Sequence, residues 1–203
     1  MSIKIIILTN ILCFSVFLNA NILPITKIKK GCENGVAKDC SLLAFYLELD
    51  SILNNDYNKT IYYYKKACRL DYKECGGLAG LYATGKGVNR DIQKSFTLYN
   101  KACENGSMSS CLQIGMMYQE GIFVKVDYKK SLNLFKKVCL SNSPSKFDGC
   151  YLLGNLYKNG FGVHKNINYA IKYFKEVCDK GKGTTKSFGC DEIKKINNSS
   201  KTR

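Results

Sequence analysis

The sequence predicts an all-α fold, an α/α-hairpin solenoid in which disulfides connect stacked helical hairpins. Three observations predict it. Cysteine pairs recur at one constant spacing, small and apolar residues recur at helical intervals within that spacing, and an even number of cysteines follows an N-terminal export signal.

Residues 1–20 have the composition of an export signal. After a short basic start, the apolar run from Ile5 to Leu18 is too short to span a bilayer comfortably, and Ala20 provides a small residue for signal peptidase. We expect cleavage after Ala20, which removes Cys13 from the eleven cysteines and leaves ten. An even number is what a disulfide framework requires, so we expect a secreted or periplasmic protein in an oxidising compartment.

The mature chain is strongly basic. Removing Lys4 from the 31 basic residues leaves 30 against 16 acidic ones, a formal charge of +14. Only Arg69, Arg90 and Arg203 are arginines, whereas nucleic-acid readers rely on arginine forks for bases and phosphates. We therefore expect a lysine-coated solvated surface and no nucleic-acid partner. Because no second apolar run is long enough to cross a bilayer, we expect no membrane span.

Four modules follow from the cysteine spacing. Each module separates two cysteines by 28 positions: Cys40 and Cys68, Cys75 and Cys103, Cys111 and Cys139, Cys150 and Cys178. The expected organisation is a signal at 1–20, an N-terminal half-hairpin cap at 21–39, repeats at 40–74, 75–110, 111–149 and 150–189, and a C-terminal cap with a frayed tail at 190–203. The first repeat is degenerate, since Asp50 lies where the other three have glycine.

The first half of each module predicts an amphipathic helix. An aliphatic residue three positions after the cysteine precedes a small one: Leu43 and Ala44, Leu78 and Ala79, Ile114 and Gly115, Leu153 and Gly154. A tyrosine one turn later recurs at Tyr82, Tyr118 and Tyr157, with Leu47 in the first module. Glycine then ends the helix at Gly85, Gly121 and Gly160.

The second half of each module predicts a second helix, which begins after a capping residue: Asp56, Asp91, Asp127 or Asn166. Its apolar stripe has three rows: Ile61, Phe96, Leu132 and Ile171; Tyr64, Tyr99, Phe135 and Phe174; Ala67, Ala102, Val138 and Val177. At helical spacing in every module, these aromatic residues are interpreted as core. One hairpin cannot bury such a stripe alone, so the modules must stack.

The segments outside the hairpins are expected to be less regular. Asp191 to Asn197 predict a short closing helix, and Asn198 to Arg203 are expected to fray. The links at 141–149 and 179–189 contain Gly, Ser and Pro and are expected to be surface loops.

Two disulfide schemes fit a stacked array. In the first, partners lie across the short links: Cys32 with Cys40, Cys68 with Cys75, Cys103 with Cys111, Cys139 with Cys150, and Cys178 with Cys190. In the second, each hairpin is closed internally, as by Cys40 with Cys68, and Cys32 and Cys190 remain unpaired at opposite ends. The first scheme is preferred because it uses all ten cysteines.

The repeated leucine, small residue, tyrosine, glycine turn, aspartate and aromatic-rich helix resemble the TPR-related Sel-like repeat. With a cysteine at the start of the first helix and another at the end of the second, the chain resembles the secreted cysteine-rich Hcp family of Helicobacter from Ile28 to Ile196. That resemblance implies β-lactam binding and hydrolysis, or contact with host or cell-wall partners. It also implies disulfides across the short links.

A search for hydrolytic chemistry gives weak signals. Ser143 and Lys146 form a Ser-x-x-Lys string in a link, rather than at a helix start, and no Lys-Thr-Gly motif accompanies it, so Ser143 is assigned no role. His164 is the only histidine and is expected in an exposed turn. Cysteines committed to disulfides cannot donate thiolates, so no metal and no cofactor are expected.

The remaining candidates lie on the first helices, outside the apolar stripe, where the concave side of a solenoid binds its partners. They are Gln113, Met116, Gln119, Asn155 and Lys158. Two functions are predicted for this concave groove. One is hydrolysis of a β-lactam or a peptidoglycan-like small molecule, which the resemblance implies. The other is non-catalytic binding of a protein or peptide, which the architecture favours.

Overall fold

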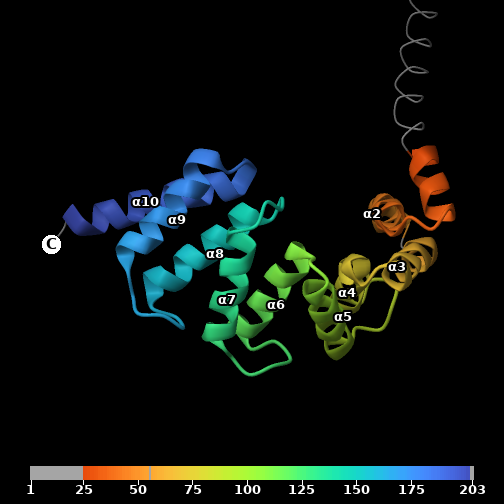
Figure 1. Cartoon of the computed structure of the whole chain (residues 1–203), viewed down its shortest axis with the longest axis horizontal. Helices are drawn as coiled ribbons and strands as arrows, with labels where there is room; N and C mark the ends of the chain where they lie inside the picture. The colour runs from red at the N-terminus through yellow and green to blue at the C-terminus, as the bar shows by residue number, and fades with distance from the viewer. Residues whose placement is uncertain (1–24, 55, 202–203) are drawn as a thin grey trace, which may run out of the picture.

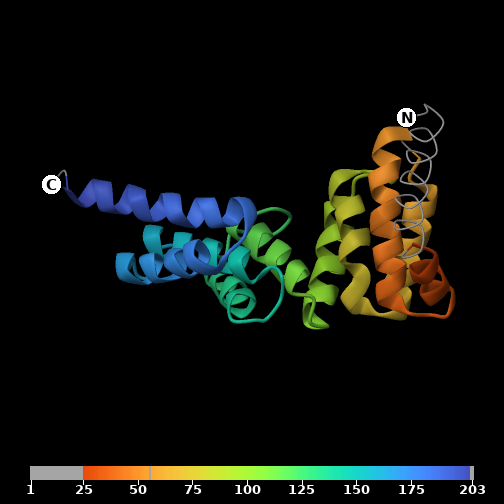
Figure 2. The same ribbon diagram turned by 90° about the horizontal axis from the view of Figure 1, so that it is seen from above.

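The structure is a computed structural model that describes residues 25–54 and 56–201, and it consists of helical hairpins stacked side by side. The stack forms an arc in which α2 (Ala37–Asn54) and α10 (Gly183–Lys201) end on the same side (Figure 1). The helices near the N-terminus run across the direction of those near the C-terminus (Figure 2), so the stack twists as it curves.

Each module consists of two helices, as predicted, and the all-α solenoid is confirmed. A helix at residues 25–33 precedes α2. Between α2 and α10 lie α3 (Asn58–Leu70), the short 3-10 helix η1 (Tyr72–Cys75), α4 (Gly76–Thr84), α5 (Ile92–Glu104), α6 (Met108–Glu120), α7 (Tyr128–Cys139), α8 (Lys146–Asn159) and α9 (Ile167–Lys180).

The turn inside each regular module follows from its glycine. Gly85, Gly121 and Gly160 have φ values of 76°, 71° and 77°, a left-handed conformation that residues with a Cβ rarely adopt. In each, the backbone N–H donates to a carbonyl four residues earlier, which satisfies one of the free carbonyls at the helix end. The first module lacks this glycine, and α2 continues through Asp50 to Asn54.

Side-chain caps begin three of the second helices, as predicted. The side-chain oxygens of Asp91, Asp127 and Asn166 accept from the backbone N–H three residues later, at 2.8, 2.9 and 3.0 Å. In the first module, Asp56 instead accepts from the backbone N–H of Asn58, and no side chain caps α3.

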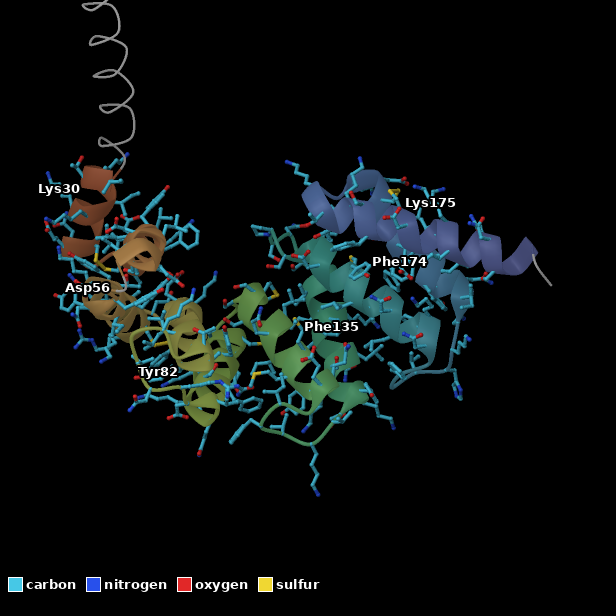
Figure 3. The ribbon with its side chains drawn as sticks, turned by 180° about the vertical axis from the view of Figure 1, so that it is seen from behind. Lys30, Asp56, Tyr82, Phe135, Phe174 and Lys175 are labelled. Carbon is cyan, nitrogen blue, oxygen red and sulfur yellow. A yellow bond between two sulfur atoms is a disulfide. The ribbon has the colours of Figure 1, made fainter. Side chains whose placement is uncertain are left out.

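Aromatic rings of the second helices fill the core. Phe135 and Phe174 are fully buried between neighbouring helices (Figure 3). A Cβ at Gly115 would lie 2.6 Å from the Phe135 ring, and one at Gly154 would lie 2.7 Å from the Phe174 ring. The small residue of each first helix is therefore required by the close approach of the aromatic ring.

Five disulfides connect successive helices across the links between hairpins. They join Cys32 to Cys40, Cys68 to Cys75, Cys103 to Cys111, Cys139 to Cys150, and Cys178 to Cys190. This is the pairing across the short links, and none of these bonds closes a hairpin internally. The sequence separations are only 7 to 12 residues.

The structure differs from the prediction at the C-terminus. The closing helix begins at Gly183, inside the segment expected to be a loop, and remains helical through Lys201, where a frayed tail was expected. Its first turns are fixed by contacts with earlier modules, because the Thr185 hydroxyl donates to Asp148 at 2.6 Å and Gly189 approaches Val177 closely. Tertiary contacts override the weak helix propensity of this glycine-containing segment.

The predicted signal at residues 1–20 lies outside the described residues. Across residues 25–54 and 56–201, none of the helices combines the length and the apolar character needed to cross a membrane.

Candidate functional site

The structure distributes the five predicted groove residues over different environments. Gln113 lines a surface hollow, Met116 packs against the apolar core, and Asn155 is half-buried on α8. The side-chain oxygen of Gln119 is buried, with no hydrogen-bond partner among the described residues. Lys158 is ion-paired to the closing helix. Only Gln113 therefore lines this hollow.

That hollow, of about 250 Å³, extends over the starts of three successive first helices. It is lined by Ser41 of α2, Gly76 and Gly77 of α4, Tyr99 of α5 and Gln113 of α6. Gly77 and Gln113 occupy equivalent positions two residues after the module cysteine. The hollow thus follows the repeat across helices that lie side by side, which is the geometry of a groove.

The glycines of α4 allow tyrosines of α3 and α5 to approach this helix closely. A Cβ at Gly77 would lie 2.1 Å from the Tyr64 ring, so this position admits no side chain without rearrangement. A Cβ at Gly80 would lie 3.4 Å from the Tyr99 hydroxyl, an ordinary contact distance. The Tyr99 hydroxyl therefore reaches the surface of α4 beside Gly80.

Exposed apolar side chains continue this surface along α2. Phe45 is 50% exposed and Leu49 is 52% exposed, and Leu42 is also exposed. In the repeat, Phe45 occupies the position of Gly80 and Met116, and Leu42 that of Gly77 and Gln113. We define the first-helix groove as these apolar residues of α2, five residues that line the hollow, and Gly80 beside Tyr99: Leu42, Phe45 and Leu49; Ser41, Gly76, Gly77, Tyr99 and Gln113; and Gly80.

Sequence reasoning missed the α2 part of the first-helix groove because the first module was interpreted as a degenerate cap. The signal was present, since Leu42, Phe45, Tyr46 and Leu49 follow one another at intervals of three and four residues. A second apolar stripe on a helix that already has one buried face indicates a contact with something outside the fold.

A tyrosine and glutamate pair lies behind the groove. The Tyr64 hydroxyl donates to Glu48 Oε2 at 3.0 Å, and Lys86 Nζ lies 3.1 Å from Glu48 Oε1. Burial and the neighbouring Glu48 carboxylate both raise the pKa of Tyr64 and of Tyr99 above the ordinary value. Both phenols therefore stay protonated at physiological pH, and their O–H groups remain hydrogen-bond donors.

An ion-pair cluster covers the other end of the arc. Glu192 of α10 lies 2.6 Å from Lys158 Nζ and 2.9 Å from Lys195 Nζ. Burial acts to raise the pKa of Glu192, but hydrogen bonds from the two lysines lower it below the ordinary value. Lys158 is thus a structural contact between α8 and α10, and it also lines an open hollow of about 760 Å³ together with Glu192 and Lys195.

The Ser143 hydroxyl has no general base beside it among the described residues. Lys146 is the first residue of α8, so the Ser-x-x-Lys string does reach a helix start, in contrast to the prediction. However, the Ser143 hydroxyl is 2.8 Å from that of Ser141, and Lys146 Nζ is 3.0 Å from Glu176. A nucleophile requires a general base within hydrogen-bond reach, and Ser143 has none in this arrangement.

The cysteines at residues 32–190 form no thiolate metal site, since all ten are paired in disulfides. Ligand atoms of Cys139, Cys150 and Glu176 lie within 4.8 Å of one another, but the two sulfurs form a disulfide and cannot coordinate as thiolates. His164 is exposed in the α8–α9 turn, as expected.

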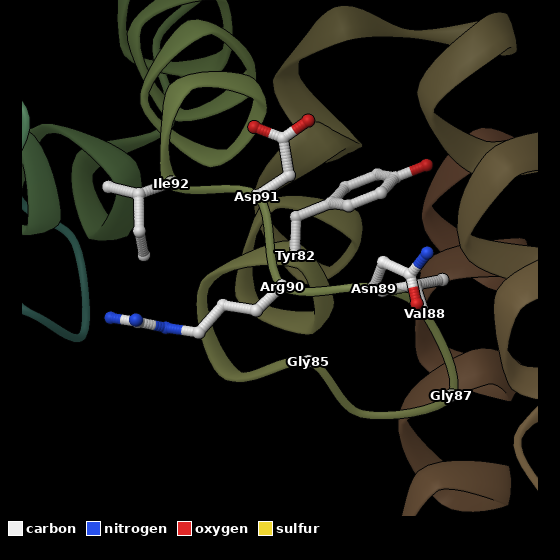
Figure 4. Close-up of a pocket in the computed structure, with 8 residues that line it drawn as sticks. All are labelled: Tyr82, Gly85, Gly87, Val88, Asn89, Arg90, Asp91 and Ile92. Atoms are coloured by element: carbon white, nitrogen blue, oxygen red, sulfur yellow. The ribbon is translucent and has the colours of Figure 1, made fainter.

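A second, wide-open hollow lies at the turn between α4 and α5 (Figure 4). Its polar groups already have structural partners, since Arg90 Nε donates to the Ala83 carbonyl and Asp91 caps α5. Arg90 and Tyr82 point in opposite directions (Figure 4), so they do not converge on a common ligand position. This hollow belongs to the turn rather than to a binding site.

Comparisons with known proteins agree with this architecture. The Sel1 repeat family matches residues 37–72, 76–107, 109–143 and 147–182, more than half of the chain. The fold is similar to that of c5321, a protective antigen present in uropathogenic Escherichia coli strains, with a TM-score of 0.67, 22% identity, and coverage of 83% of this chain and 35% of that one.

Two relatives have a higher sequence identity to this chain, over shorter spans of it. Cytochrome c oxidase assembly factor 7 of Xenopus tropicalis is 32% identical over 75 residues, which cover 36% of this chain and 32% of that protein, so this chain matches about a third of its length. Helicobacter pylori cysteine rich protein B is 32% identical, over 60% of this chain and 91% of that one, with a TM-score of 0.45. Four matched repeats joined by disulfides between cysteines of successive helices place the chain in the Sel1 repeat family, among its cysteine-rich members.

Proposed function

We propose that the protein is a non-catalytic interaction scaffold, secreted or periplasmic, whose first-helix groove binds an extended segment of a partner protein. One observation carries the proposal: exposed apolar side chains of α2 lie beside a glycine-lined hollow that continues across α4 to α6. Sel1 repeats commonly mediate protein interactions. Five disulfides and the lack of a membrane-spanning helix among the described residues are consistent with an extracytoplasmic location.

The groove combines the two features that peptide recognition needs. Phe45 and Leu49 offer apolar anchors that are already ordered on a helix, and their burial by a partner stabilises the complex. The Tyr99 hydroxyl and the Gln113 amide offer hydrogen bonds to a peptide backbone or side chain at the hollow. Because the disulfides fix each module junction, the groove is preorganised and loses little entropy on binding.

Selection from a library of displayed random 12-residue peptides tests the proposal with the oxidised mature protein. Enriched peptides should contain apolar side chains, and their affinity should fall at least tenfold with Gly80→Leu, which places a large side chain beside the Tyr99 hydroxyl, and with Phe45→Ser, which removes an anchor. Leu140→Ser is the matched control, since Leu140 is 70% exposed beyond α7 and outside the groove. Equal binding by all three variants would contradict the groove assignment.

The same protein preparation tests the alternative function, hydrolysis of a β-lactam or a peptidoglycan-like substrate. We expect no turnover of the chromogenic cephalosporin nitrocefin above that of protein unfolded by reduction and heat. Turnover that depends on the folded protein would replace the scaffold proposal with a hydrolase.

A further inference from the structure

The turns of the third and fourth modules expose several apolar side chains at one edge. Phe123 and Val126 are each 51% exposed, and Ile122 and Phe161 are exposed as well. Both turns lie along the lower edge of the molecule in Figure 1. The Phe161 ring stacks on Tyr128 at a centroid distance of 4.7 Å, which makes the two turns neighbours.

Phe123 adopts a backbone conformation that glycine occupies in the equivalent turns. Its φ is 65°, and the corresponding residues of the second and fourth modules are Gly87 at 65° and Gly162 at 70°. A bulky residue in this left-handed region is strained. Phe123 packs partly on Phe96, with a centroid distance of 5.5 Å, but half of its side chain remains exposed. Packing within the chain therefore does not explain why phenylalanine, rather than glycine, occupies this position.

Lysines surround the exposed apolar residues. Lys125, Lys129 and Lys165 are exposed and take part in none of the ion pairs found among the described residues. Two acidic residues lie nearby, Glu120 and Asp127, and Asp127 is engaged as the cap of α7. We define the turn edge as the exposed residues of both turns: Ile122, Phe123, Val126 and Phe161, with Lys125, Lys129 and Lys165.

We propose that the turn edge binds the surface of an anionic phospholipid bilayer. Phe123, Val126 and Phe161 would enter the boundary between headgroups and acyl chains, and the lysines would lie at the level of the phosphates. Apolar and aromatic side chains flanked by basic residues have the composition of a peripheral membrane contact. The lysines favour an anionic bilayer over an uncharged one, because an exposed ammonium group gains most electrostatic energy beside a dense array of phosphates.

Membrane binding through the turn edge would leave the first-helix groove accessible. The turns lie at the end of each hairpin away from the disulfides, whereas the hollow lies over the starts of the first helices, beside the cysteines. Membrane binding and peptide binding are therefore compatible, and neither proposal depends on the other.

Co-sedimentation with vesicles tests the turn edge. The oxidised mature chain should sediment with vesicles of phosphatidylglycerol and phosphatidylcholine and remain in solution with phosphatidylcholine alone. Phe123→Gly, which restores the residue of the equivalent turns, should weaken partitioning at least fivefold, whereas Leu140→Ser should leave it unchanged. Far-ultraviolet circular dichroism before each assay establishes that the variants are folded.

Charge-reversal variants distinguish binding by the turn edge from attraction caused by the positive charge of the whole chain. Lys125→Glu combined with Lys165→Glu should reduce partitioning at least tenfold. Lys137→Glu combined with Lys180→Glu gives the same net charge, with both changes at the opposite end of the hairpins. If both double variants lose binding equally, or if the unaltered protein does not prefer the anionic vesicles, the proposal is overturned.

Discussion

At the scale of single residues, side-chain size is matched across the three junctions that follow α5, α7 and α9. Where the second helix carries valine, at Val138 and Val177, the residue before the next cysteine is glycine, and a Cβ there would lie 2.7 or 2.8 Å from the valine methyl group. Where it carries the smaller Ala102, the corresponding residue is Ser110. The total volume at the junction is conserved, as close-packed interiors require.

Gly115→Ala tests the corresponding size matching inside a module, between α6 and α7. The added methyl group would lie 2.6 Å from the fully buried Phe135 ring, so we expect a loss of about 1 to 3 kcal/mol in the free energy of unfolding. Gly80→Ala is the control, because its methyl group meets only the Tyr99 hydroxyl at 3.4 Å, and it should be neutral or stabilising by up to about 1 kcal/mol through helix propensity. Urea unfolding measures both, and equal effects would contradict the packing argument.

At the scale of helices and turns, polar caps determine where the second helices begin. Asp127→Ala removes the acceptor for the Lys130 backbone N–H and should lower the free energy of unfolding by about 1 kcal/mol. Asp127→Asn is the matched control, because Asn166 performs the same role in the next module, and it should cost much less. Thermal unfolding of the two variants provides the measurement, and equal losses would indicate that the charge matters rather than the cap.

Most helices could be predicted because their signals are local. Apolar residues at helical spacing, the capping residues and the turn glycines identify α4 to α9 within a few residues. The start of α10 could not be predicted in this way, since Gly181, Gly183 and Gly189 suggest a loop. The available signal was non-local: the Gly-Cys pair ending at Cys190 repeats the pair ending at Cys150, and both glycines fit against a valine of the preceding helix.

The candidate site was less predictable than the fold. The repeat predicted which helices carry the candidate residues, but the environment of each side chain depends on its neighbours in space. Lys158 was predicted to be a groove residue, but it forms an ion pair with Glu192 because the predicted closing helix packs against α8, a contact that the sequence does not indicate. Surface residues outside a periodic stripe carry little sequence signal about their contacts.

At the scale of the whole molecule, the disulfides connect every module to the next. Each closes a short loop and should stabilise the fold by about 2 to 3 kcal/mol on a chain-entropy estimate. Reduction should therefore lower the unfolding temperature of the mature protein by well over 10 °C, and mapping of non-reduced peptides should show five linked pairs and no free thiol. An unfolding temperature that does not respond to reductant would exclude a stabilising role for the disulfides.

The short sequence separations of the five disulfides also bear on how the chain acquires them. The first cysteine of each pair is bonded to the next cysteine along the sequence. A chain that crosses a membrane from its N-terminus therefore presents both partners of a bond before the next pair emerges. An oxidase that links cysteines in order of appearance would form native bonds alone, and the repeat could be completed one hairpin at a time without a disulfide isomerase.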